Sequence, residues 1–124
     1  MVPAMNFGIH EEGHTLLKKM VEDIGGVKMW TLWVIAAIMG KRKGETVPVK
    51  GRKVDVGKIS TLPPYLLSVI ISLTDGDVSD MRKVLSQAEL YASVGVYDLY
   101  AMYSQMKDHF IDELAFQVLR NLSR

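Results

Sequence analysis

The sequence contains no cysteine. This absence excludes a disulfide-bonded scaffold, a zinc or iron–sulfur site with Cys ligands, and a Cys nucleophile. Residues 1–17 also contain neither lysine nor arginine, so the basic start of a secretory signal peptide is missing. Both absences are compatible with a reducing compartment, and we expect the protein to be cytoplasmic.

Long hydrophobic runs are missing as well. The most apolar stretch, residues 27–39, is shorter than the roughly 20 apolar residues that a bilayer-spanning helix needs, and it contains Lys28. We therefore expect no membrane association and interpret this stretch as a buried helix. Because it is apolar almost all round, it is expected at the centre of the fold, covered by neighbouring elements.

The composition is that of an ordinary globular protein. The 124 residues are 48% hydrophobic and 23% charged, and a chain of this length buries roughly two thirds of its unfolded surface when it folds. No internal repeat or long linker divides the sequence. We predict a single domain over residues 1–124.

Hydrophobic periodicity predicts helices over most of the chain. In residues 9–24, apolar residues recur at steps of three and four, as expected for one face of a helix. Further helices are predicted at residues 65–73, at residues 79–103 with a break or kink at Gly95, and at residues 106–122. The predicted fold class is therefore mainly α, a single-domain bundle of five or six helices.

One small β-hairpin is predicted at about residues 46–56. Valines alternate with other residues on both sides of a turn-like Lys50-Gly51-Arg52 sequence, which is the pattern of two short strands with one buried face. Pro48 lacks an amide donor, so its strand is expected at a sheet edge. A two-stranded hairpin is marginal alone and must pack on the helices.

His10, Glu11 and His14 match the H-E-x-x-H pattern of zinc hydrolases. On a helix, two histidines four positions apart share a face and can ligate Zn²⁺, while the glutamate can activate a metal-bound water. A catalytic zinc also needs a third protein ligand, and nothing in the sequence places the remaining histidine, His109, beside His10. We expect surface histidines and no metal or other cofactor; the alternatives are the zinc hydrolase and a non-catalytic metal site at His10 and His14.

Basic residues concentrate in residues 41–58. Seven basic and two acidic residues give this segment a charge of +5, whereas eight basic and twelve acidic residues give the rest of the chain −4. Such a segment can bind the phosphates of a nucleic acid with little sequence preference, or it can bind an acidic protein. The alternative is a solvated edge hairpin that lysines protect from aggregation. The candidate binding residues are Lys41, Arg42, Lys43, Lys50, Arg52, Lys53 and Lys58.

Several short motifs follow one another in the order of a known family. They are Ala36-Ala37-Ile38-Met39-Gly40, then Gly44 and Pro48, then Ile71-Ser72-Leu73-Thr74-Asp75-Gly76-Asp77, then Tyr91-Ala92-Ser93-Val94-Gly95 with Leu99. Over residues 36–99, about half of the chain, the sequence resembles the small accessory proteins encoded beside DNA phosphorothioation (DNA sulfur modification) systems. The family's Tyr-Ala-x-Gly-Gly motif is one glycine short here. The resemblance implies a role in prokaryotic DNA modification or defence, with no catalytic residue to carry over.

These observations predict a non-catalytic accessory or adaptor protein that contacts nucleic acid or an acidic partner through its basic hairpin. The resemblance adds a DNA-associated role in a prokaryotic modification or defence system. Two alternatives stay open: a minimal zinc hydrolase, and a helical protein–protein interaction module with no nucleic-acid role. Eight methionines are compatible with self-association into a homo-oligomer.

Overall fold

The computed structural model describes residues 5–44, 52–74, 79–106 and Ala115. The predicted mainly α fold is confirmed, with four described α-helices where the sequence predicted five or six. The helix predicted at residues 106–122 lies almost entirely outside the described residues. The elements are β1 (Asn6–His10), α1 (Glu11–Ile24), α2 (Met29–Lys43), β2 (Lys53–Lys58), the 3₁₀ turn η1 (Ile59–Thr61), α3 (Pro64–Leu73) and α4 (Met81–Met106).

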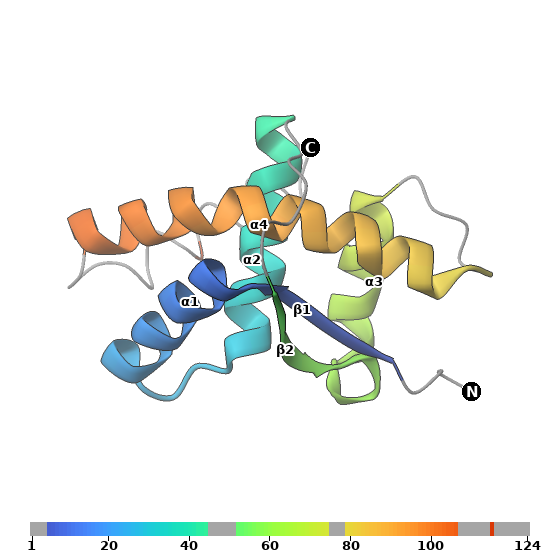
Figure 1. The fold of residues 1–124 in the computed structure, drawn as a ribbon, viewed down its shortest axis with the longest axis horizontal. Helices are drawn as coiled ribbons and strands as arrows, with labels where there is room; N and C mark the ends of the chain where they lie inside the picture. Colours follow the sequence, from blue (N-terminus) through green and yellow to red (C-terminus); the bar gives the residue numbers. More distant parts are fainter. Residues whose placement is uncertain (1–4, 45–51, 75–78, 107–114, 116–124) are drawn as a thin grey trace.

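The crossing of α2 and α4 forms the centre of the fold. Figure 1 shows α4 lying across the molecule and α2 passing behind it at a steep angle. As its apolar sequence predicted, α2 is buried around most of its circumference, and Leu32, Trp33 and Ala36 have no exposed surface. In the described part of the chain, no helix is both long and apolar enough to cross a membrane.

Two glycines allow α2 and α4 to approach closely. A Cβ atom on Gly40 of α2 would overlap the backbone carbonyl of Tyr91, and one on Gly95 of α4 would overlap the backbone carbonyl of Ala36. Of the break or kink predicted at Gly95, the break is wrong, because α4 continues through this residue. Glycine provides space here for a neighbouring backbone rather than a change of chain direction.

β1 and β2 form a two-stranded antiparallel sheet in which Ile9 pairs with Val54. The strand predicted around Val54 is thus present, but its partner among the described residues is β1. Residues 45–51, which contain most of the other predicted strand and the turn of the hairpin, lie outside the described residues. The described sheet therefore joins two segments that α1 and α2 separate along the chain.

The helix predicted from residue 9 begins two residues later, at Glu11. Ile9 and His10 belong to β1, where Phe7 and Ile9 are both fully buried. Within α1 the predicted apolar face is confirmed, since Leu17 is buried while the charged residues are exposed. The error at the start arises because a strand residue and a helix face happen to continue the same apolar spacing.

Contacts of Gly8 hold β1 against α2 and β2. The indole Nε1–H of Trp33 donates a hydrogen bond to the Gly8 carbonyl at 2.9 Å, and the Trp33 ring lies 4.5 Å from that of Phe7, centroid to centroid. The register of the sheet shifts between Phe7 and Gly8. A Cβ on Gly8 would overlap the backbone carbonyl of Val54, so the close approach of the strands requires glycine at this position.

Candidate functional site

The first group of predicted binding residues ends α2. Lys41, Arg42 and Lys43 are exposed in its last turn, where cations interact favourably with the helix dipole. Gly44 follows with a left-handed backbone (φ 75°), and its N–H donates to the carbonyls of Gly40 and Lys41. This conformation favours glycine, so the sequence itself ends the helix directly after the three cations.

Two of these lysines contact α4. The Nζ atom of Lys41 lies 3.5 Å from the hydroxyl oxygen of Tyr91 and 5.3 Å from the centroid of its ring. The Nζ atom of Lys43 lies 3.5 Å from an oxygen of Asp98, and both side chains are nearly half exposed. Contacts of this exposed kind are worth about 1 kcal/mol or less, so a stronger anionic ligand can displace them.

The second group lies on β2 and just before it. Arg52, Lys53 and Lys58 are exposed, whereas Lys50 lies outside the described residues. The Nζ atom of Lys53 lies 3.2 Å from an oxygen of Glu89, whose side chain is only 10% exposed. The same carboxylate oxygen accepts the backbone N–H of Gly8 at 2.8 Å. Lys53 therefore balances a carboxylate that the fold has buried.

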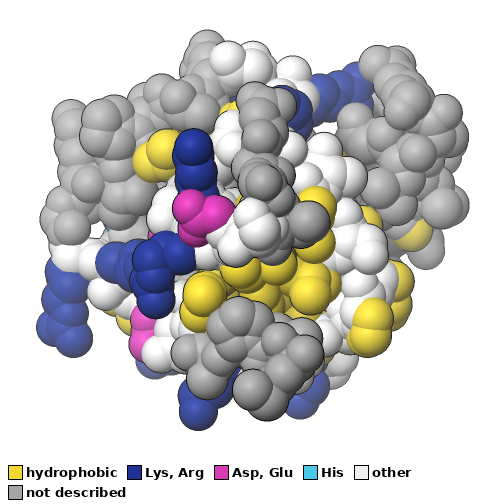
Figure 2. Space-filling model, turned by 90° about the vertical axis from the view of Figure 1, so that its right-hand side faces the viewer, with side chains coloured by type: hydrophobic (Ala, Val, Ile, Leu, Met, Phe, Trp, Pro, Cys, Tyr) yellow, Lys and Arg dark blue, Asp and Glu magenta, His cyan; other side chains and the backbone are white. Residues whose placement is uncertain are grey.

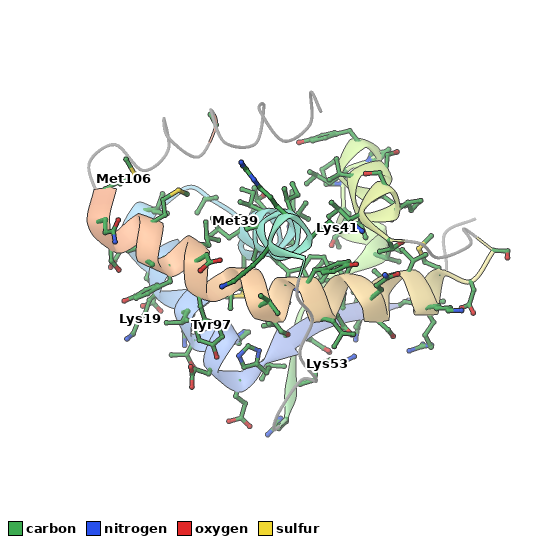
Figure 3. All side chains as sticks on the ribbon, turned by 90° about the horizontal axis from the view of Figure 1, so that it is seen from above. Lys19, Met39, Lys41, Lys53, Tyr97 and Met106 are labelled. Carbon is green, nitrogen blue, oxygen red and sulfur yellow. The ribbon has the colours of Figure 1, made fainter. Side chains whose placement is uncertain are left out.

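α4 separates the two basic groups. Glu89 and Tyr91 are two residues apart, which at about 100° per residue places them on nearly opposite sides of the helix. Lys53 contacts the first and Lys41 the second, and Figure 3 shows the two lysines on either side of α4. Lys41 and Lys53, one from each basic group, thus lie on opposite sides of α4 rather than along a single ribbon.

The H-E-x-x-H pattern does not form the expected helical pair. His10 ends β1 with an extended backbone (φ −64°, ψ 159°) and precedes the first helical residue, so it shares no helix face with the half-buried His14. Residues 5–44, 52–74 and 79–106 contain no group of three His, Cys, Asp or Glu side chains that could hold a metal ion. His109 lies outside them. The pair of histidines on one helix face, from which the zinc hydrolase was predicted, is therefore not formed by His10 and His14.

His10 is buried, so the expectation of a surface histidine is wrong here, and the residue joins β1 to α4. Its Nε2 atom lies 2.8 Å from the hydroxyl oxygen of Tyr97, a hydrogen-bonding distance, while its Nδ1 atom is buried and has no hydrogen-bond partner among the described residues. Burial lowers the pKa of His10, and the nearby Glu12 charge opposes this shift. Burial and Glu12 together raise the pKa of Tyr97 to about 12, so the phenol stays protonated at neutral pH.

Sequence reasoning missed Glu89 and Tyr97. Glu89 interrupts a buried stripe of α4 between Ala88 and Ala92, and a charged residue inside such a stripe was the signal that could have revealed it. Tyr97 gave no comparable signal, because its contact with His10 joins residues 87 positions apart. Both residues tie α4 to the N-terminal strand.

α3 presents an apolar surface that the sequence did not predict. Its sequence is Pro-Tyr-Leu-Leu-Ser-Val-Ile-Ile-Ser-Leu, in which Ile70 is buried and the leucines, the valine and the other isoleucine are only partly buried against the core. Tyr65 is 68% exposed. Figure 2 views the side of the molecule on which α3 lies and shows hydrophobic side chains gathered in its middle, with Lys and Arg toward its edges.

Comparison with known proteins gives no relative for this arrangement. No protein-family model matches the chain, and no curated protein or solved structure is significantly similar to it.

Proposed function

We propose that the protein is a non-catalytic accessory or adaptor protein that binds the phosphate backbone of duplex DNA through basic residues of the 41–58 segment. The supporting observation is that six of these residues, in the two groups described above, have exposed side chains. Binding of this kind gains free energy from the release of counterions and depends little on base sequence.

The contacts of each basic residue indicate how much it contributes to the free energy of DNA binding. Arg52 and Lys58 have no acidic partner among the described residues, so a phosphate reaches them without breaking an ion pair. Lys53 must leave Glu89, whose buried carboxylate would then lose a balancing charge, and this loss is costly. We therefore assign more of the binding free energy to Arg52 and Lys58 than to Lys53.

A salt titration of duplex binding tests this proposal. The wild type is expected to lose affinity steeply as salt rises, with a log–log slope of about −0.9 for each phosphate contact. Arg52→Ala/Lys58→Ala should make the slope shallower by about 1.8, if each side chain contacts one phosphate. The matched control is Lys18→Ala/Lys19→Ala, which removes two exposed lysines from α1 and should leave the slope unchanged.

Absence of duplex binding at low salt would contradict the proposal, as would equal slopes for the two double variants. The resemblance to accessory proteins of DNA phosphorothioation systems suggests one further comparison. A duplex that carries phosphorothioate linkages and an unmodified duplex of the same sequence should be titrated side by side. Because we attribute binding to backbone charge, similar slopes are expected for both.

A helical protein–protein interaction module without a nucleic-acid role is the second candidate. The exposed apolar surface of α3 favours it, since contiguous exposed apolar surface commonly marks a binding interface. If the wild-type protein does not bind duplex DNA at low salt, this result would favour the second candidate over the first.

A further inference from the structure

Contacts with α4 place the basic end of α2 on one side of this helix. Lys41 contacts Tyr91, and Lys43 contacts Asp98. Asp98 follows Tyr91 by about two helical turns, so these two side chains face the same way. The last turn of α2, with its three exposed cations, therefore lies over this side of α4. Figure 1 shows the end of α2 rising above α4.

The two-stranded sheet lies on the opposite side of α4. Glu89 is about 200° from Tyr91 around the helix. Its carboxylate accepts the backbone N–H of Gly8 in β1 and contacts Lys53 in β2, and these contacts hold both strands on the Glu89 side. In Figure 1, β2 runs below α4, away from the last turn of α2.

Arg52 and Lys58 extend the basic surface along this sheet. The Arg52 carbonyl accepts the backbone N–H of Glu11 at 3.1 Å, and Lys58 pairs with Asn6 of β1. Both basic side chains are exposed. The exposed carboxylates of Glu11 and Asp55 belong to the same region, but among the described residues neither forms an ion pair with Arg52 or Lys58. A phosphate that reaches these cations therefore displaces solvent rather than a bound carboxylate.

One straight duplex cannot contact both groups. An α-helix with its side chains is about 10–12 Å across, so a duplex on one side of α4 would have to turn back around the helix to reach the other side. Duplex DNA has a persistence length of about 150 bp, and it does not fold back over so short a distance. Each group must therefore meet a different stretch of duplex.

We propose that the protein bridges two segments of duplex DNA, one at the last turn of α2 and one along β2. This inference rests on the proposed DNA binding and adds a second duplex to it. On the α2 side, the contacts of Lys41 and Lys43 are weak enough for phosphates to replace them. Two duplexes repel each other, and cations on both sides of one protein offset that repulsion by neutralising phosphates.

Capture of one duplex by another tests bridging. A duplex of about 30 bp, well below the persistence length, is fixed to beads, and a fluorescent duplex of unrelated sequence is added in solution at about 50 mM salt. As the wild-type protein is titrated in, the beads should retain the fluorescent duplex. Capture should fall again at a large excess of protein, because each duplex then binds its own copies of the protein.

Lys41→Ala/Lys43→Ala separates bridging from binding. It should lower capture by about ten-fold or more, because it removes two phosphate contacts from one side. Its affinity for a single duplex should stay close to that of the wild type, because Arg52 and Lys58 remain. The matched control is Lys18→Ala/Lys19→Ala, which removes the same charge from exposed positions of α1 and should capture as the wild type does.

The possible failures are distinguishable. A wild type that binds duplex DNA but retains no fluorescent duplex overturns bridging and leaves the proposed DNA binding standing. Capture that persists unchanged in Lys41→Ala/Lys43→Ala also overturns it, because the second duplex would then be held by self-associated protein through a single surface. If the wild type binds neither duplex, the proposed function itself fails, and bridging fails with it.

Discussion

At the residue scale, the helix crossing reverses the usual effect of a common substitution. Alanine normally stabilises a helix by about 1 kcal/mol relative to glycine. We expect Gly95→Ala to destabilise the protein, because the added Cβ would overlap backbone atoms of α2 that cannot rotate away. Overpacking of this kind costs about 1–3 kcal/mol, which a lower urea midpoint would report.

Gly13→Ala is the matched control for this prediction. There the added Cβ would meet the ends of the Ile9 and His10 side chains rather than backbone, so a smaller loss is expected. A gain in stability for Gly95→Ala would contradict the close crossing of α2 and α4.

His10 is a second residue whose surroundings lead to a prediction. Burial lowers the pKa of His10 below the ordinary value of 6.5. At a pH near 6.5, the His10 side chain therefore binds fewer protons in the folded protein than in the unfolded chain. The unfolding free energy therefore decreases as the pH falls below about 6.5. We expect the urea midpoint to drop between about pH 7.5 and 5.5, and His10→Gln to reduce that drop.

His14→Gln serves as the comparison, because it removes a histidine from the same helix start without touching the contact with Tyr97. This variant keeps His10 and should therefore keep the drop that His10 causes. If His10→Gln and the wild type show the same drop, the titration of His10 does not control stability in this range.

At the scale of elements, Glu89 holds β1 against α4. Glu89→Ala removes the acceptor of the Gly8 N–H and the partner of Lys53, and hydrogen bonds to charged groups are worth about 1.5–3 kcal/mol. We expect a loss of this size in the unfolding free energy, with faster hydrogen exchange at the amides of β1. Glu89→Gln keeps an acceptor and should lose less. Equal losses for the two variants would argue against the Gly8 contact.

The elements differ in how far the sequence could predict them. α1 and α2 were predictable because their apolar residues follow the helical period within the segment itself. β1 was not, since five residues carry little periodicity and Ile9 also fits the stripe of α1. The partner of β2 was missed for a related reason: Val54 pairs with a strand that two helices separate from it, and no local pattern reports that pairing.

The candidate site also has a part that the sequence could predict and a part that depends on the folded structure. Exposure of the basic residues in the 41–58 segment could be predicted from their charge, and the described ones are exposed. Their separation by α4 could not, because it depends on how Glu89 and Tyr91 face in the folded molecule. The H-E-x-x-H match failed as a helical motif because its first residue falls on the boundary between strand and helix.

At the scale of the whole molecule, the described chain closes on itself through contacts between its beginning and α4. Gly8 and Glu89 are 81 residues apart, and His10 and Tyr97 are 87 apart. The hydroxyl of Tyr103 donates to a carboxylate oxygen of Asp23, 80 residues earlier, at 2.6 Å. Contacts this distant in sequence slow folding, because a long loop must close before they form.

The position of β1 has a consequence for biosynthesis. A ribosome releases this strand first and α4 last of the described elements, at roughly 5–20 residues per second. Phe7 and Ile9, which have no exposed surface in the finished fold, therefore stay in contact with solvent for several seconds while their cover is being made. During that interval the nascent chain presents a short apolar segment of the kind that chaperones bind, and any pause in translation before α4 would prolong it.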